Sequence, residues 1–141
     1  KLYEEAYAAY DRAIELNPKN LLCLNNYAYF LSQQNTQLEK ALKMSKKTIE
    51  AEPENATYLD TYAWILFVSK KYDEAKTFID RTLQHAELNS ENYTLFDHAG
   101  DIYFHIGERN QAVDFWKKAL SVCPDAGDAR KLRRKIRYRR P

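Results

Sequence analysis

The feature that most constrains this chain is an alanine that returns at nearly constant intervals. It stands at Ala6, Ala41, Ala75 and Ala112, with steps of 35, 34 and 37 residues. Two antiparallel helices can cross closely only where their side chains are small. A period of about 20–50 residues is typical of repeat proteins, in which each unit packs only on its neighbours.

Further positions recur with the same period. Four residues after the alanine stands a mostly bulky residue, in order Tyr10, Ser45, Ile79 and Trp116. Three residues later comes a small one: Ala13, Thr48, Thr82 and Ala119. A proline, which cannot continue a helix, closes all units but the third: Pro18, Pro53 and Pro124, with Glu87 in the third.

These positions predict helices over residues 1–17, 20–33, 38–51, 55–69, 72–86, 92–106 and 109–122. The unequal steps place one extra residue in the Ser32–Gln37 turn and three in the Ala86–Asn92 connection. Asn20, Asn55 and Asn92 stand where helix N-caps are needed. A last helix over 126–138 carries Ala129, Leu132 and Ile136 on one side, as expected of a helix that caps the final unit.

The most complete unit shows a known pattern. It reads Phe96-x2-Ala99-Gly100-x2-Tyr103, then Ala112-x3-Trp116-x2-Ala119-x4-Pro124. This resembles the tetratricopeptide repeat, and the strings Leu59–Trp64 and Asp97–Asp101 are similar to those of bacterial members. The resemblance implies an all-α, right-handed superhelical solenoid of antiparallel helix pairs. Its units would be a half repeat (1–19), three full repeats (20–54, 55–91 and 92–125) and a capping helix (126–141).

The chain begins inside a repeat, so we expect it to be a piece of a longer protein. The sequence does not indicate a cellular compartment. Its longest strongly apolar run, Tyr62–Val68, is far too short to cross a bilayer. Cys23 and Cys123 are one hundred positions apart. We expect two free thiols, although a disulfide between them is not excluded.

In the family, the first helix of each repeat lines a concave groove that binds extended peptides or partner helices. The resemblance places these residues in the groove: Asn25, Asn26, Tyr29, Asp60, Thr61, Trp64, Phe67, Asp97, His98, Asp101, Phe104 and His105. By hypothesis, Tyr29 and Trp64 supply apolar contact, and Asp60, Asp97 and Asp101 select a partner with cationic side chains. Two alternatives remain: Trp64 in the core between repeats, and aspartates on a solvated or capping face.

Two other functions of such a groove can be weighed from its residues. Members that clamp a C-terminal carboxylate use Lys and Arg, whereas the matching positions here are Asn25, Asn26, Tyr29, Thr94 and His98, so we exclude that clamp. Asp97, Asp101 and His105 share one helix face at spacings of four, which suits a metal ion but is common by chance. No catalytic or phosphate-binding motif is present, so we predict a non-catalytic protein without metal or cofactor.

Charge is unevenly distributed. The chain has a net charge of +2, but residues 130–140 hold eight Lys and Arg and no acid, which leaves −6 on the rest. The alternative function is therefore that this tail binds nucleic acid or an anionic membrane surface. Its plainer interpretation is a solvated basic face of the capping helix. The tail residues are Arg130, Lys131, Arg133, Arg134, Lys135, Arg137, Arg139 and Arg140.

Overall fold

The structure is a computed structural model that describes residues 2–141. Within this range it contains eight α-helices, one short 3₁₀ helix and no strand. Each α-helix begins and ends within two residues of its predicted range. The helices are α1 (Leu2–Leu16), α2 (Leu21–Gln33), α3 (Leu38–Ala51), α4 (Ala56–Val68), α5 (Tyr72–Gln84), η1 (Ser90–Asn92), α6 (Tyr93–His105), α7 (Arg109–Val122) and α8 (Ala126–Tyr138).

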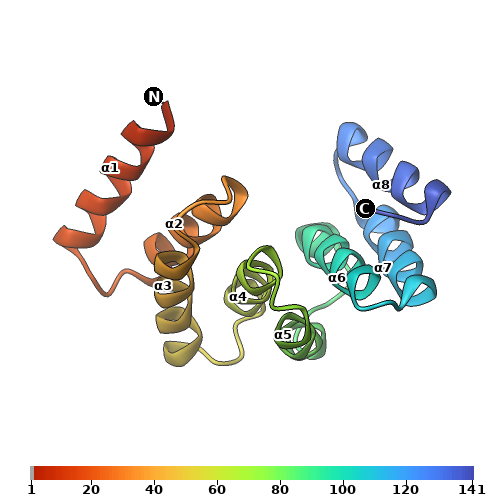
Figure 1. The fold of residues 1–141 in the computed structure, drawn as a ribbon, viewed down its shortest axis with the longest axis horizontal. Helices are drawn as coiled ribbons and strands as arrows, with labels where there is room; N and C mark the ends of the chain where they lie inside the picture. The colour runs from red at the N-terminus through yellow and green to blue at the C-terminus, as the bar shows by residue number, and fades with distance from the viewer. Residues whose placement is uncertain (1) are drawn as a thin grey trace.

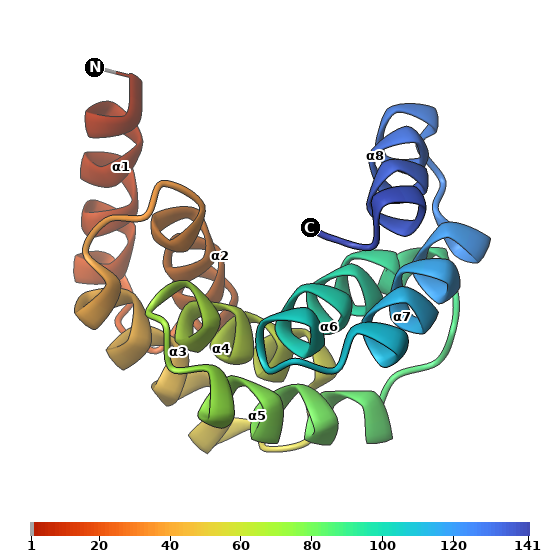
Figure 2. The same cartoon turned by 45° about the vertical axis from the view of Figure 1, so that its right-hand side comes forward.

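The helices form antiparallel pairs that stack into a curved rod (Figure 1). Helices α2, α4 and α6 lie along the inner, concave side, and α3, α5 and α7 lie outside them (Figure 2). Helices α1 and α8 rise at the two ends, so the rod has the outline of a U (Figure 2). The fold is therefore the all-α solenoid predicted from the repeat.

Small residues mark the helix crossings, as predicted. Ala41, Ala75 and Ala112 are completely buried. The tightest crossing joins α6 to α7, where a Cβ added to Gly100 would lie 2.2 Å from Nε1 of Trp116. Only glycine at this position leaves room for the buried indole, which fills the end of the core.

The turns inside the helix pairs show where the repeat varies. In the α4–α5 and α6–α7 turns one residue has a positive φ, Lys70 at 64° and Gly107 at 92°. The α2–α3 turn contains two such residues, Asn35 at 51° and Gln37 at 49°. This confirms the extra residue predicted between Ser32 and Gln37.

Two of the three predicted asparagine caps are confirmed. Oδ1 of Asn20 accepts a hydrogen bond from the backbone N–H of Cys23 at 3.1 Å. Oδ1 of Asn55 accepts one from Tyr58 at 3.1 Å. Each bond satisfies a backbone donor that the first turn of a helix leaves without a partner.

Asn92 stands at the N-cap position of α6, but without the side-chain hydrogen bond that the other two caps make. The extra residues of this connection form η1, whose cap is Asn89, with its side chain accepting from the N–H of Glu91 at 3.1 Å. Asn92 makes no side-chain cap; its Nδ2 donates instead to the carbonyl of Glu87 at 2.7 Å. The Asn92 side chain therefore acts as a hydrogen-bond donor within the connection between α5 and α6. Its position in the sequence did not reveal this role.

The end helices pack less deeply than the pairs between them. Helix α1 has no buried residue and is held by Tyr10, whose ring stacks on Tyr27 with centroids 4.8 Å apart. Helix α8 buries Ala129 and Leu132 against the last repeat, with Ile136 partly buried beside them, as predicted. Cys23 and Cys123 are free thiols.

Candidate functional site

The residues predicted to line a groove lie on α2, α4 and α6, the three inner helices (Figure 2). Asn25, Thr61, His98 and Asp101 are at most 9% exposed and lie beneath the surface. The others are partly or fully exposed: Asn26, Tyr29, Asp60, Trp64, Phe67, Asp97, Phe104 and His105. The fold thus assembles this set on neighbouring helices, and contact of these residues with a partner stays a prediction.

A row of rings runs across the inner helices. The Trp64 ring stacks on His98 with centroids 3.9 Å apart, and on Phe67 at 4.8 Å. Phe67 in turn meets the edge of His105 at 4.9 Å, and His105 stacks on Tyr72 at 5.3 Å. Trp64 is half-buried, so its ring both packs between repeats and reaches the surface. Packing of Trp64 between repeats is thus observed, and its contact with a partner stays a prediction.

His98 connects three successive repeats from its buried position on α6. Its Nδ1 lies 3.0 Å from Oδ1 of Asp60 on α4, and its Nε2 lies 3.4 Å from the hydroxyl of Tyr29 on α2. Burial alone would lower the pKa of His98. The charge of Asp60 and its hydrogen bond, with smaller contributions from Asp97 and Asp101, outweigh burial and raise the pKa above its ordinary value.

The other two aspartates bind a lysine from the last helix. Nζ of Lys135 on α8 lies 2.7 Å from Oδ1 of Asp97 and 3.0 Å from Oδ1 of Asp101. The sequence had assigned both carboxylates to a cationic partner. The fold instead supplies the cation from the same chain, because α8 packs on α7 and its Lys135 reaches both carboxylates of α6.

Asp101 sits deepest in this arrangement. Its Oδ1 also accepts a hydrogen bond from Nε1 of Trp116 at 3.1 Å. Burial raises the pKa of Asp101, and Lys135 opposes this rise without cancelling it. Burial acts to lower the pKa of Lys135, but Asp101 and Asp97 together raise it above its usual range. Each charge here depends on the other for compensation.

A pocket of about 290 Å³ opens beside the ring row, between α2, α4 and the start of α6. Five of the predicted groove residues line it, namely Asn25, Asn26, Tyr29, Asp60 and Thr61. Tyr29 is largely buried there, and burial with the nearby charges of Asp60 and Asp97 raises the pKa of Tyr29 to about 12. Its hydroxyl is therefore neutral and available for hydrogen bonding at physiological pH.

The metal hypothesis finds no support in the geometry. Among residues 2–141, no group of three or more His, Cys, Asp or Glu side chains could hold a metal ion. Asp97 and Asp101 bind Lys135, and Nδ1 of His105 lies 3.0 Å from the backbone carbonyl of Asp101, one turn back on its own helix. The side chains of the inner helices therefore offer apolar and hydrogen-bonding surface.

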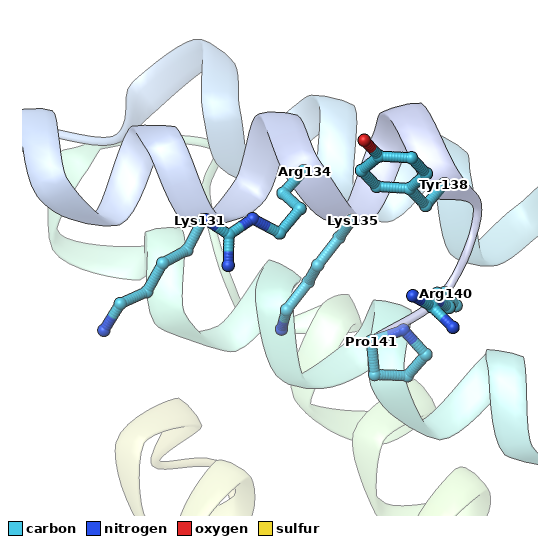
Figure 3. Close-up of a pocket in the computed structure, with 6 residues that line it drawn as sticks. All are labelled: Lys131, Arg134, Lys135, Tyr138, Arg140 and Pro141. Atoms are coloured by element: carbon cyan, nitrogen blue, oxygen red, sulfur yellow. The ribbon is translucent and has the colours of Figure 1, made fainter.

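The residues of the basic tail fall into two groups. Some line a pocket beside α8, and the others do not. Lys131, Arg134 and Lys135 extend from α8 toward the inner helices, as Figure 3 shows. With Tyr138, Arg140 and Pro141 they line a pocket of about 390 Å³. The remaining tail residues, Arg130, Arg133, Arg137 and Arg139, do not line this pocket.

Sequence reasoning missed two contributors. Tyr72 is the first residue of α5, an outer helix, yet its ring joins the inner row through Phe67 and His105. Lys135 was assigned to the tail and not to the groove. The spacing of Ala129, Leu132 and Ile136 predicted which side of α8 is buried, and Lys135 lies next to that side. The angle at which α8 meets α6 was not predictable from this spacing.

Models of the tetratricopeptide repeat match residues 9–43 and residues 93–125. The chain is a tetratricopeptide repeat protein. No sequence of a curated protein matches it.

Solved structures of other proteins share the fold, and one of them is a tetratricopeptide repeat (TPR) protein. YrrB, described as a TPR protein with an unusual peptide-binding site, is 26% identical with a TM-score of 0.67. That match covers 88% of this chain and 62% of the YrrB chain, so this chain spans less than two thirds of YrrB. PilF of Pseudomonas aeruginosa is 21% identical with a TM-score of 0.72, over 96% of this chain and 62% of its own. MamA is 16% identical with a TM-score of 0.69, over 97% and 81%.

No helix within residues 2–141 combines the length and the apolar character that a membrane crossing requires.

Proposed function

We propose that this TPR protein is a non-catalytic scaffold whose concave face binds a protein or peptide partner. The half-buried Trp64 ring on the concave face carries this proposal, because it offers apolar contact area already fixed in place. His98 and Phe67 both stack on the ring and hold it, so little conformational entropy is lost when a partner covers it. The peptide-binding site described for YrrB supports the same kind of partner.

Within this proposal, the groove residues have different roles. Trp64, Phe67 and Tyr29 supply the apolar surface, and the polar pocket beside Tyr29 receives backbone or side-chain groups of the partner. The proposed selection of cationic side chains is the less favoured part. A partner cation would have to compete with His98 for Asp60 and displace Lys135 from Asp97. We therefore assign these carboxylates chiefly to holding the groove in shape.

Peptide selection tests the proposal without knowledge of the natural partner. The chain is screened against a library of random linear peptides, and the enriched peptides are titrated against Trp64→Ala. We expect enriched peptides whose affinity falls about tenfold or more in Trp64→Ala, since buried aromatic contacts dominate interfaces of this kind. Leu16→Ala is the matched control, because Leu16 is 74% exposed at the end of α1 and makes no part of the ring row.

The possible results distinguish the concave face from the basic tail as the binding surface. If Trp64→Ala and the further variant Trp64→Ala with Asp97→Ala bind every enriched peptide as well as the unchanged chain does, the concave face is not the binding surface. If nucleic acid or anionic vesicles bind instead, with affinity that falls steeply as salt rises, the tail is the working surface. Removal of residues 130–141 is a poorer test, because it also takes Leu132 from the core and Lys135 from Asp97.

A further inference from the structure

We propose that a pocket formed by α8 and the C-terminal residues that follow it binds carboxylate side chains of an acidic segment of the partner. The pocket is the one of about 390 Å³ described above, and we call it the α8 pocket. This inference rests on the proposed function, because it adds an acidic segment to the peptide that lies over the ring row. It also reverses the sign of the charge selection that the sequence suggested.

Three cations of the α8 pocket have no acidic partner. Lys131, Arg134 and Arg140 form no ion pair with any residue of the described chain, 2–141. Lys135, which lines the same pocket, is already bound to Asp97 and Asp101. The pocket therefore holds one compensated cation and three that an incoming anion can reach.

The acids of the concave face do not offset these cations. Asp60 lies against His98, and Asp97 and Asp101 share Lys135. The raised pKa of His98 favours its charged form beside Asp60. Asp60 and Asp97, the carboxylates beside Trp64 and His98, thus already have partners.

The side chains around the cations suit a carboxylate in an extended segment. The Tyr138 ring is 56% exposed, and the guanidinium of Arg140 lies 6.0 Å from its centroid. Figure 3 shows Lys131 and Arg134 extending from α8 on one side of the pocket, with Arg140 and Pro141 near its other end. Arg donates paired N–H groups that match a carboxylate, while Lys acts as a point charge.

The distribution of charge favours a short acidic segment over a long polyanion. Residues outside the tail carry a net charge of −6, which repels a polyanion laid along the rod. A segment with a few carboxylates can place them in the α8 pocket and its apolar residues on the ring row. A nucleic acid would gain as much from Arg130, Arg133 and Arg137, which lie outside the pocket.

This difference gives a matched pair of variants. Lys131→Gln with Arg134→Gln removes two charges from the α8 pocket, and Arg130→Gln with Arg133→Gln removes two from the same helix outside it. All four side chains are exposed, and none has an ion-pair partner in the described residues, so both variants keep the fold contacts of α8. Lys135 is left unchanged because it supports Asp97 and Asp101.

The test uses the peptides enriched in the selection above. We expect them to carry Asp or Glu beside an apolar stretch, and to lose about tenfold in affinity with Lys131→Gln/Arg134→Gln. The Arg130→Gln/Arg133→Gln control should change affinity by less than about threefold at 0.15 M salt, where distant charges are screened. Replacing the peptide acids by Gln or Asn should remove the difference between the two variants.

Failure of this inference is distinguishable from failure of the proposed function. Peptides that depend on Trp64 but are neutral or rich in Lys and Arg overturn the inference and leave the groove proposal standing. Equal losses in the two double variants also overturn it, because they indicate a general attraction to the tail. Absence of any peptide that depends on Trp64 overturns both.

Discussion

Nζ of Lys135 lies 2.7 Å from Oδ1 of Asp97, and this contact joins the capping helix to the concave face. The two residues are 38 positions apart and belong to α8 and α6. Their side chains are 19% and 27% exposed, so water only partly screens the pair. Lys135 thus connects the capping helix to α6 and also balances negative charge in the candidate groove.

Removal of this lysine should destabilise the C-terminal repeat. Lys135→Gln leaves Asp97 and Asp101 close together without a cation, and we expect the free energy of unfolding to fall by about 2 kcal/mol. Denaturation in urea, followed by circular dichroism, measures the change. Lys131→Gln is the control on the same helix and should shift stability by about 0.5 kcal/mol or less. Equal stability of the two variants would show that Lys135 does not compensate the aspartates.

The crossing of α6 and α7 should not tolerate a methyl group. Gly100→Ala ordinarily favours a helix, but here its Cβ would lie 2.2 Å from Nε1 of Trp116, so the indole must move. We expect a loss of about 1–3 kcal/mol of stability, measured by urea denaturation. In a Trp116→Phe background the smaller ring leaves room, and the same glycine change should cost clearly less. A Gly100→Ala protein as stable as the unchanged chain contradicts the tight crossing.

The pKa of His98 should lie above its ordinary value of 6.5, because the charge and hydrogen bond of Asp60, together with the charges of Asp97 and Asp101, outweigh burial. A folded-state pKa above the unfolded one stabilises the protein while pH is below the unfolded value. This contribution is lost as pH rises through the folded-state pKa. We therefore expect the melting temperature to decline from about pH 6.5 upward, and the decline to be smaller in His98→Gln.

An NMR titration of the imidazole checks the same relationship directly. The midpoint of His98 should exceed 6.5 in the unchanged chain. Asp60→Asn removes the nearest negative charge and leaves burial in place, so the midpoint should drop. A His98 midpoint at or below 6.5 before any substitution is the result that refutes this account.

Two asparagines should respond differently to replacement by aspartate. Asn20 caps α2 through its oxygen, so Asn20→Asp keeps the bond and adds a charge that the helix N-terminus favours. Asn92 instead donates from Nδ2 to the Glu87 carbonyl, and Asn92→Asp replaces that donor by an acceptor. We expect Asn92→Asp to cost about 1–2 kcal/mol and Asn20→Asp to cost nothing measurable. Thermal melts of the two variants side by side decide the point.

The repeat pattern predicted most of the fold because it reports on local geometry. Ala41, Ala75 and Ala112 are small because two helices touch there, and that need repeats wherever a hairpin of helices repeats. The extra residue near Gln37 was visible as a change in step and appeared as a second positive φ in that turn. Asn92 takes the N-cap position without a side-chain cap, because the added length of its connection forms a 3₁₀ turn that the pattern did not show.

The candidate site was only partly predictable. Family resemblance brought Tyr29, Trp64 and His98 onto the inner helices, since position within a helix fixes which side a residue faces. The resemblance did not show that His98 is buried against Asp60 and stacked on Trp64, because such contacts depend on the distance between repeats. For the same reason the resemblance did not show that Asp97 binds Lys135.

The sequence by itself determined the helices and their pairing, because these follow from side-chain size and spacing along one chain. The resemblance to the family implied the inner position of α2, α4 and α6. Only the tertiary structure decided which residues balance the charges of the groove. Lys135 reaches Asp97 and Asp101 because α8 crosses the end of the rod at a particular angle. Interactions between residues far apart in sequence depend on such angles, which no local periodicity records.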